Sequence, residues 1–156
     1  MRLTFLSHFI ISLAIAAGAW FAWRAGVFSI VWANDQSHVT SLIAALFVVT
    51  VIELGRQAWL LEGWHYEDRL NGRRYRVENP SSSGWGHQAK EWSVMMGLLG
   101  TTIGLSLQAT ALAQNGTASL GALSTSLFST GTGVVSALLI GVMTYSLEMG
   151  IKRSTK

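Results

Sequence analysis

The sequence predicts an all-α integral membrane protein with four transmembrane helices arranged as two helical hairpins. Half of the 156 residues are hydrophobic and only 12% are charged, which is typical of membrane proteins and not of soluble domains. Four apolar runs are each long enough to cross about 30 Å of hydrocarbon as a helix. The polar segments between the runs are short, except for one near the middle of the chain.

The apolar runs give the bounds of the predicted elements. The spans cover residues 5–23, 39–61, 92–113 and 120–147, and the first helix could also continue past Arg24 to Trp32. Because short polar connectors join the spans in pairs, residues 1–61 form a first hairpin and residues 92–156 a second hairpin with a short basic tail. Residues 62–91 are expected to form a short loop between the hairpins.

The basic residues predict the orientation. If four helices alternate across the membrane, all eleven Lys and Arg residues except Arg24 fall on one side. Cytoplasmic segments carry the excess of Lys and Arg, so both termini and the middle loop are expected in the cytoplasm. The basic cluster at residues 72–76 fits this topology signal better than a nucleic-acid site. The start of the chain, with Arg2 before an apolar stretch, also fits a signal peptide.

Several chemistries are not expected from the composition. The chain has no cysteine, which excludes disulfides and thiolate metal sites, and its four histidines lack the spacing of metal ligands. There is no phosphate-binding loop and no nucleophile elbow. The sequence therefore predicts neither an enzyme nor a metal site, and no cofactor apart from a transported ion.

The third span carries an unusual stripe of small and polar residues. At about 100° per residue, Gly97, Thr101, Gly104 and Gln108 lie within about 40° of one another on one helical face. Such a face either packs closely against another helix or lines a polar path. Packing explains the glycines, whereas a polar path better explains the accumulation of hydroxyl side chains in this span.

The fourth span repeats the pattern. Ser126, Thr130, Gly133 and Thr144 fall on one face, and consecutive antiparallel helices can turn two such faces toward a common axis. Neither span has an Asp, Glu or His in its interior, and hydroxyl groups do not titrate near neutral pH. The two spans can therefore line an ion path, but a second protein must supply the titratable carboxylate.

Three charged residues lie near the predicted cytoplasmic ends of spans. Glu53 and Arg56 are spaced to pair on one helix, and Glu148 ends the polar face of the fourth span. An ion pair at the membrane interface is one interpretation of these residues. A proton exit route or a contact with a neighbouring subunit is the other.

Two segments resemble a known family. Residues 97–104, Gly-Leu-Leu-Gly-Thr-Thr-Ile-Gly, resemble the G-L-L-G-T-x-x-G signature of the MotA/TolQ/ExbB proton-channel family. Residues 127–135, Leu-Phe-Ser-Thr-Gly-Thr-Gly-Val-Val, are similar to the L-L-A-T-A-I-G-L-V segment of that family. The resemblance covers residues 92–152, somewhat over a third of the chain.

The resemblance implies a pore subunit of a membrane motor in the bacterial inner membrane. Family members form a homopentamer around a dimer of a single-span MotB/TolR/ExbD-like partner, whose membrane aspartate accepts the ion. On this sequence the two pore threonines correspond to Thr101 and Thr130, with Thr102 and Ser126 beside them. The glycines that would allow close approach are Gly97, Gly100, Gly104 and Gly133. The expected partners are thus that protein and membrane lipids, with no nucleic acid, and the ion is H⁺ or Na⁺.

This sequence also departs from the family. Thr125 stands where many TolQ- and ExbB-like members carry a glutamate, and the single proline, Pro80, lies in the loop and not in the third span as in the MotA branch. Two other functions therefore stay open beside the motor subunit. One is a small four-helix transporter, although the first span lacks the acidic residue that drug/proton antiporters use. The other is a membrane scaffold that assembles without conducting ions.

Overall fold

The computed structural model describes residues 3–35, 37–71, 82–117 and 120–154, and every regular element in those ranges is a helix. The helices are α1 (Leu3–Arg24), α2 (Val27–Asn34), α3 (Val39–Asn71), α4 (Ser82–Asn115) and α5 (Leu120–Ser154). Four of them, all except the short α2, contain segments long and apolar enough to span a membrane. The prediction of an all-helical, multi-pass membrane protein with four spans is confirmed.

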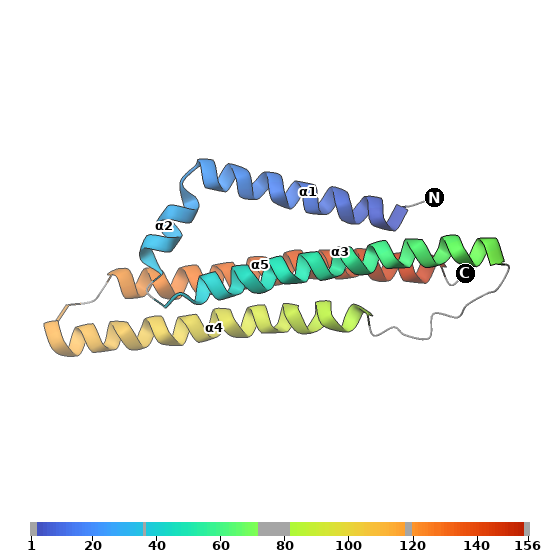
Figure 1. Ribbon diagram of the computed structural model, residues 1–156. Helices are drawn as coiled ribbons and strands as arrows, with labels where there is room; N and C mark the ends of the chain where they lie inside the picture. Colours follow the sequence, from blue (N-terminus) through green and yellow to red (C-terminus); the bar gives the residue numbers. More distant parts are fainter. Residues whose placement is uncertain (1–2, 36, 72–81, 118–119, 155–156) are drawn as a thin grey trace.

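The long helices α3, α4 and α5 run side by side, and α1 lies against this group at an angle (Figure 1). The most extensive contact is between α4 and α5, followed by the contacts of α3 with both. The described ends of the chain, the end of α3 and the start of α4 all lie toward one end of the bundle (Figure 1). This arrangement is that of two hairpins whose connections lie at the opposite end, with α2 as part of the first connection.

The first span ends sooner than its hydropathy allows. Gly26 adopts the left-handed conformation with φ of 75°, which glycine reaches without a Cβ clash and which interrupts a right-handed helix. The amide of Gly26 bonds back to the carbonyl of Trp23 over 3.0 Å, and α2 starts in a new direction. The alternative that the first helix continues to Trp32 is therefore wrong.

A buried aspartate organises the corner between α2 and α3. Asp35 Oδ2 accepts a hydrogen bond from the backbone amide of Thr40 over 2.9 Å, and Oδ1 accepts two from Ser37, from its amide over 3.1 Å and its hydroxyl over 2.7 Å. The Thr40 amide lies in the first turn of α3, where helical amides have no partner within the helix. Asp35 thus supplies an acceptor where α3 begins.

Two helices extend into the predicted loop. Residues 62–71 belong to α3 and residues 82–91 to α4, so both ends of the expected loop are helical. Hydropathy marks where a segment leaves the apolar region, whereas a helix satisfies its own backbone and can continue into water. The basic cluster at residues 72–76 lies outside the described residues.

The apolar centre of the bundle joins α3 to α5. Leu54 and Ala58 of α3 are fully buried against Met143 and Leu147 of α5. From α1, Ile11 and Ile15 pack onto this cluster. Apart from the buried His8, α1 contributes little more, because only 6% of the residues in its most apolar window are buried.

Candidate ion-path site at the interface of α4 and α5

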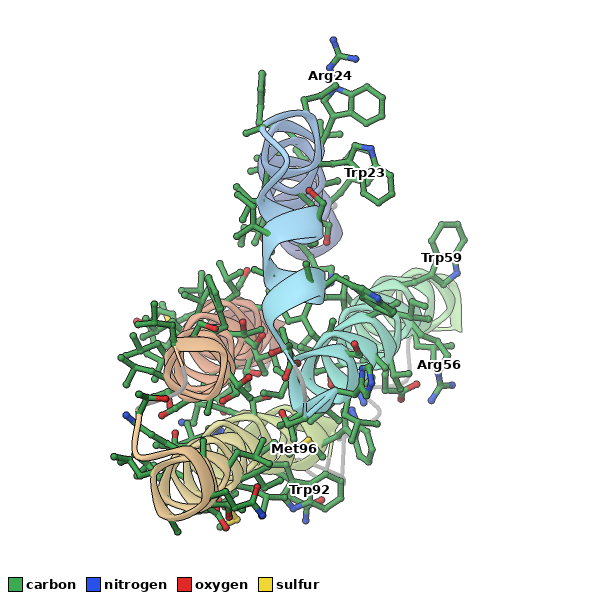
Figure 2. The ribbon with its side chains drawn as sticks, turned by 90° about the vertical axis from the view of Figure 1, so that its left-hand side faces the viewer. Trp23, Arg24, Arg56, Trp59, Trp92 and Met96 are labelled. Carbon is green, nitrogen blue, oxygen red and sulfur yellow. The ribbon has the colours of Figure 1, made fainter. Side chains whose placement is uncertain are left out.

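The two polar stripes predicted from the sequence face each other across the interface of α4 and α5. Gly97, Gly100 and Gly104 of α4 are buried, as are Ser126 and Gly133 of α5. The view along the bundle shows α4 and α5 beside each other with α3 adjoining them, whereas α1 stands apart (Figure 2). The small residues of both helices therefore make the contact between α4 and α5 of the same chain.

The glycines let the two backbones touch. A Cβ added to Gly133 would lie 2.6 Å from the carbonyl oxygen of Ser93 and 2.9 Å from the Cα of Gly97. A Cβ added to Gly104 would lie 2.8 Å from the carbonyl oxygen of Ala122. Gly100 faces the side chain of Ser129 in the same way. Any larger residue at these positions would force the helices apart, as in other membrane-helix pairs that use small residues.

The hydroxyls of Thr101 and Thr130 meet between the two helices. Their Oγ1 atoms are hydrogen-bonded to each other. Each hydroxyl also lies within bonding distance of a carbonyl in its own helix, Thr101 Oγ1 at 3.0 Å from Gly97 O and Thr130 Oγ1 at 3.0 Å from Ser126 O. Both threonines are half-buried. A hydroxyl has one hydrogen to donate and two lone pairs that accept. Either threonine can therefore turn its hydrogen from the other hydroxyl to the carbonyl of its own helix and still be hydrogen-bonded.

The other two predicted polar residues do not join this pair. Thr102 is exposed on the outer side of α4 and donates to the carbonyl of Leu99 over 2.7 Å. Ser126 is buried, with an exposed fraction of 6%, and packs against Gly104. The structure therefore brings Thr101 and Thr130 together, while Thr102 points elsewhere and Ser126 is covered by α4.

Glu53 and Arg56 form a two-point ion pair on α3. Arg56 Nε and Nη2 donate to the two carboxylate oxygens of Glu53 over 2.9 and 2.7 Å, and Gln57 Nε2 donates to Glu53 Oε1 over 3.0 Å. Arg56 and Trp59 lie on the outer side of α3 (Figure 2). Glu53 also lines an open groove of about 460 Å³ between α3 and α4, together with Val49, Ile52 and Trp85. The pair is thus remote from the Thr101–Thr130 contact.

Glu148 is paired across helices, a contact that the sequence analysis missed. His87 Nε2 of α4 lies 2.8 Å from Glu148 Oε1 of α5. The two residues are far apart in the sequence, and no spacing rule links them. The signal available was their common position at the same end of two antiparallel helices.

The second residue that the sequence analysis missed is His8 of α1. It is only 4% exposed, and neither ring nitrogen completes a hydrogen bond. A single histidine in an apolar run matches no motif, so the sequence offers no signal for it. Burial of an unpaired imidazole is uncommon in a folded protein.

No protein-family model, curated protein or solved structure matches this chain.

Proposed function

We propose that this chain is the pore subunit of an ion-driven membrane motor of the MotA/TolQ/ExbB kind. The observation that carries the proposal is the contact of the Thr101 and Thr130 hydroxyls between two glycine-packed helices. Polar groups in the middle of membrane helices are costly and commonly mark ion or proton paths. Because hydroxyls cannot titrate at neutral pH, the proposal requires a carboxylate from a partner.

The proposed assembly is a homopentamer around a dimer of a single-span MotB/TolR/ExbD-like protein in the bacterial inner membrane. The partner's aspartate would sit beside Thr101 and Thr130 in each subunit in turn. A threonine hydroxyl donates to an ionised carboxylate and accepts from a protonated one. The pair could thus accompany both charge states of the aspartate by turning its hydroxyl groups, with no movement of either helix.

The energy for the motor would come from the ion gradient. One elementary charge that crosses 100 mV releases about 2.3 kcal/mol, which exceeds the cost of rearranging one hydroxyl pair. The backbone contact of Gly97 with Gly133 would hold both threonines in fixed positions during each cycle. Glu148 lies near the end of α5, at the end of the bundle that we assign to the cytoplasm. Glu53 and Arg56 lie in the second half of the apolar segment Val39–Leu60 of α3, on the way to that end. Both carboxylates are partly exposed and already paired, and they would receive protons only after release from the partner.

A non-conducting scaffold is the second candidate, and one specific observation favours it. Thr101 and Thr130 each find an acceptor within their own helix, and threonine forms such bonds in membrane helices without any role in ion transfer. In that case the stripes serve only to pack α4 against α5. The two candidates differ in whether ions cross the membrane.

The deciding experiment measures proton uptake by vesicles that contain the chain and a candidate partner, a single-span protein with a membrane aspartate. A potassium diffusion potential drives the flux, and a trapped pH dye reports it. Thr101→Val and Thr130→Val should abolish uptake while the complex still assembles. The matched control is Thr110→Val, because Thr110 is exposed and bonds only to the carbonyl of Ser106 over 2.9 Å in its own helix.

Two results would reject the motor assignment. Full proton uptake in both valine variants would show that the hydroxyl pair has no part in the flux. An assembled wild-type complex that moves neither H⁺ nor Na⁺ would instead establish the scaffold.

A further inference from the structure

His8 is the buried contact of α1 with the rest of the bundle, and its imidazole can take up a proton. Of the α1 residues whose side chains are described, His8 alone is buried, with 4% of its surface exposed. Among the described residues no hydrogen bond to its Nδ1 or Nε2 atom has good geometry, and the backbone of Val51 on α3 is a weak partner of the ring. An unpaired buried polar group calls for an explanation other than packing.

A glycine on α3 leaves the space that the His8 ring occupies. A Cβ added to Gly55 of α3 would lie 3.5 Å from His8 Nε2 and 3.8 Å from its Cδ2, so the imidazole rests on the bare backbone of that helix. Beside it, Ser7 Oγ and Ser146 Oγ are 3.1 Å apart and join α1 to α5. The ring is therefore enclosed where three helices meet, near the end of the bundle that holds the N-terminus (Figure 1).

No charged group among the described side chains is available to compensate a proton on His8. On α3, Glu53 pairs with Arg56, which is exposed. On α5, Glu148 pairs with His87, and Tyr145 is 63% exposed. On α1 the charged residue whose side chain is described is Arg24, and it lies at the opposite end of the helix. An imidazolium ion in this position would be a buried charge without a partner, which is far more costly than a buried neutral ring.

The remainder of α1 holds on weakly. Ile11 and Ile15 are its partly buried contacts with the central cluster, and α1 diverges from α3 and α5 toward its Arg24 end (Figure 1). Beside the Ser7–Ser146 contact and these two isoleucines, the buried imidazole is a main contact of α1, so the position of α1 depends on the charge of that imidazole. His8 lies two residues inside the apolar segment Leu6–Arg24, so the ring of a released α1 can reach water at that end of the helix, and this state binds the proton better.

We propose that His8 is a proton-binding site that controls the attachment of α1, and that its protonation releases α1 from α3 and α5. In the attached state the ring is neutral, and at alkaline pH α1 is attached in all molecules. The released ring protonates near the ordinary imidazole pKa of about 6.5, so release sets in as the pH falls below that value. The inference concerns the chain alone and does not depend on a partner or on ion flow.

The test measures the distance between α1 and α5 by pulsed electron resonance, with the full chain in lipid nanodiscs. The chain has no native cysteine, so spin labels at Ala17→Cys and Leu138→Cys are unique, and both positions are exposed. Dilution with unlabelled chain keeps the signal within one molecule. From about pH 8 to about pH 5, a range that brackets the free imidazole pKa of about 6.5, the population at longer distance should grow in the wild type.

His8→Leu should hold α1 attached throughout this range, because it fills the site without a titratable group. The matched control is His87→Gln, which removes another histidine at the same end of the bundle and should keep the wild-type response. A pH response in His8→Leu equal to that of the wild type would overturn the proposal, as would an unchanged distance in the wild type. If His8→Leu does not fold, nitrogen-15 resonances of the His8 ring in the wild-type chain decide. Protonation of that ring with α1 still attached would refute the proposal, whereas protonation that coincides with release would support it.

Discussion

Gly97 of α4 and Gly133 of α5 meet backbone to backbone, and a Cβ on Gly133 would lie 2.9 Å from the Cα of Gly97. This contact sets how closely α4 and α5 approach, and it places the Thr101 and Thr130 hydroxyls within bonding distance. The effect of a methyl group differs sharply between neighbouring glycines of α5. A Cβ on Gly133 would meet the backbone of Ser93 and Gly97 in α4, whereas a Cβ on Gly131 would have no neighbour within 4 Å.

The first prediction is that Gly133→Ala destabilises the protein by about 1–3 kcal/mol, the usual cost of overpacking a tight contact. Gly97→Ala should cost less, because its Cβ would lie 3.2 Å from the nearest atom across the interface, the Ser129 carbonyl oxygen. Gly131→Ala is the matched control and should be neutral or stabilising by up to about 1 kcal/mol through helix propensity. Thermal unfolding of the purified protein in detergent, followed by circular dichroism, measures all three. Equal losses in Gly131→Ala and Gly133→Ala would contradict the proposed role of the backbone contact.

The second prediction concerns the energy of the Thr101–Thr130 hydrogen bond. Each hydroxyl retains an acceptor in its own helix when the other is removed, so the coupling between them should be small, about 0.6 kcal/mol as in other membrane-helix pairs. A double-mutant cycle with Thr101→Val and Thr130→Val, read from unfolding free energies, gives this value.

The pair of Thr101 with Thr110 is the control for this cycle and should show no coupling, since Thr110 bonds only within its own helix. A coupling above about 2 kcal/mol would mean that the hydroxyl pair is a main structural contact. Loss of ion flow in the valine variants could then no longer be separated from loss of structure.

How far the sequence predicts this molecule depends on the type of feature. Apolar length alone predicts the four spans, because lipid requires about 20 apolar residues per crossing. Helical periodicity places Gly97, Thr101 and Gly104 on one face of α4 and predicts that this face is special. It cannot tell whether such a face is covered by α5 or by another protein, because both require small residues.

Features that depend on the approach of distant segments escape the sequence. The contact of His87 with Glu148 joins two helices at positions 61 residues apart, and the burial of His8 requires the bare backbone of Gly55 on another helix. The sequence leaves open whether the first helix ends near Arg24 or continues to Trp32, and the reason is different. A glycine inside an apolar run is compatible with a continuous helix, and only the observed φ of 75° distinguishes a break from a passing glycine.

The third prediction is that the His87–Glu148 pair contributes little to stability. About half of the His87 side chain is exposed and 30% of that of Glu148, and pairs of this kind contribute up to about 1 kcal/mol, reduced by salt. Glu148→Gln should therefore lower the unfolding free energy by less than about 1 kcal/mol in dilute buffer. The difference from the wild type should shrink further at about 1 M salt, where the screening length falls to about 3 Å.

The control for Glu148 is His87→Gln. If the loss of stability in Glu148→Gln comes from the broken pair, the two single variants and the double variant should all lower the unfolding free energy by the same small amount. A larger loss in Glu148→Gln alone would assign the carboxylate a second partner.

The fourth prediction concerns Asp35 at the corner between α2 and α3, outside the membrane-spanning segments. Burial by itself would raise the pKa of Asp35, but the hydrogen bonds from Ser37 and Thr40 outweigh burial and hold the pKa below its ordinary value of 3.8. A carboxylate with a lowered pKa stabilises the folded state at all pH values above its unfolded pKa. That contribution disappears as the pH falls through the lowered value. Asp35→Ala should cost about 1–2 kcal/mol at pH 7, as for the loss of other helix-capping side chains.

Asp35→Asn separates charge from geometry, because the amide oxygen still accepts a hydrogen bond whereas the negative charge is lost. Its stability at pH 7 should lie between those of the wild type and Asp35→Ala. The difference between the wild type and Asp35→Asn should narrow as the pH is lowered from 7 toward 3, since the Asp35 carboxylate of the unfolded chain takes up a proton there more readily than that of the folded chain. Other carboxylates such as Glu148 are present in both proteins and cancel in this comparison. Thermal unfolding at a series of pH values measures the difference, and a difference that stays constant down to pH 3 would show that the charge of Asp35 contributes nothing to the start of α3.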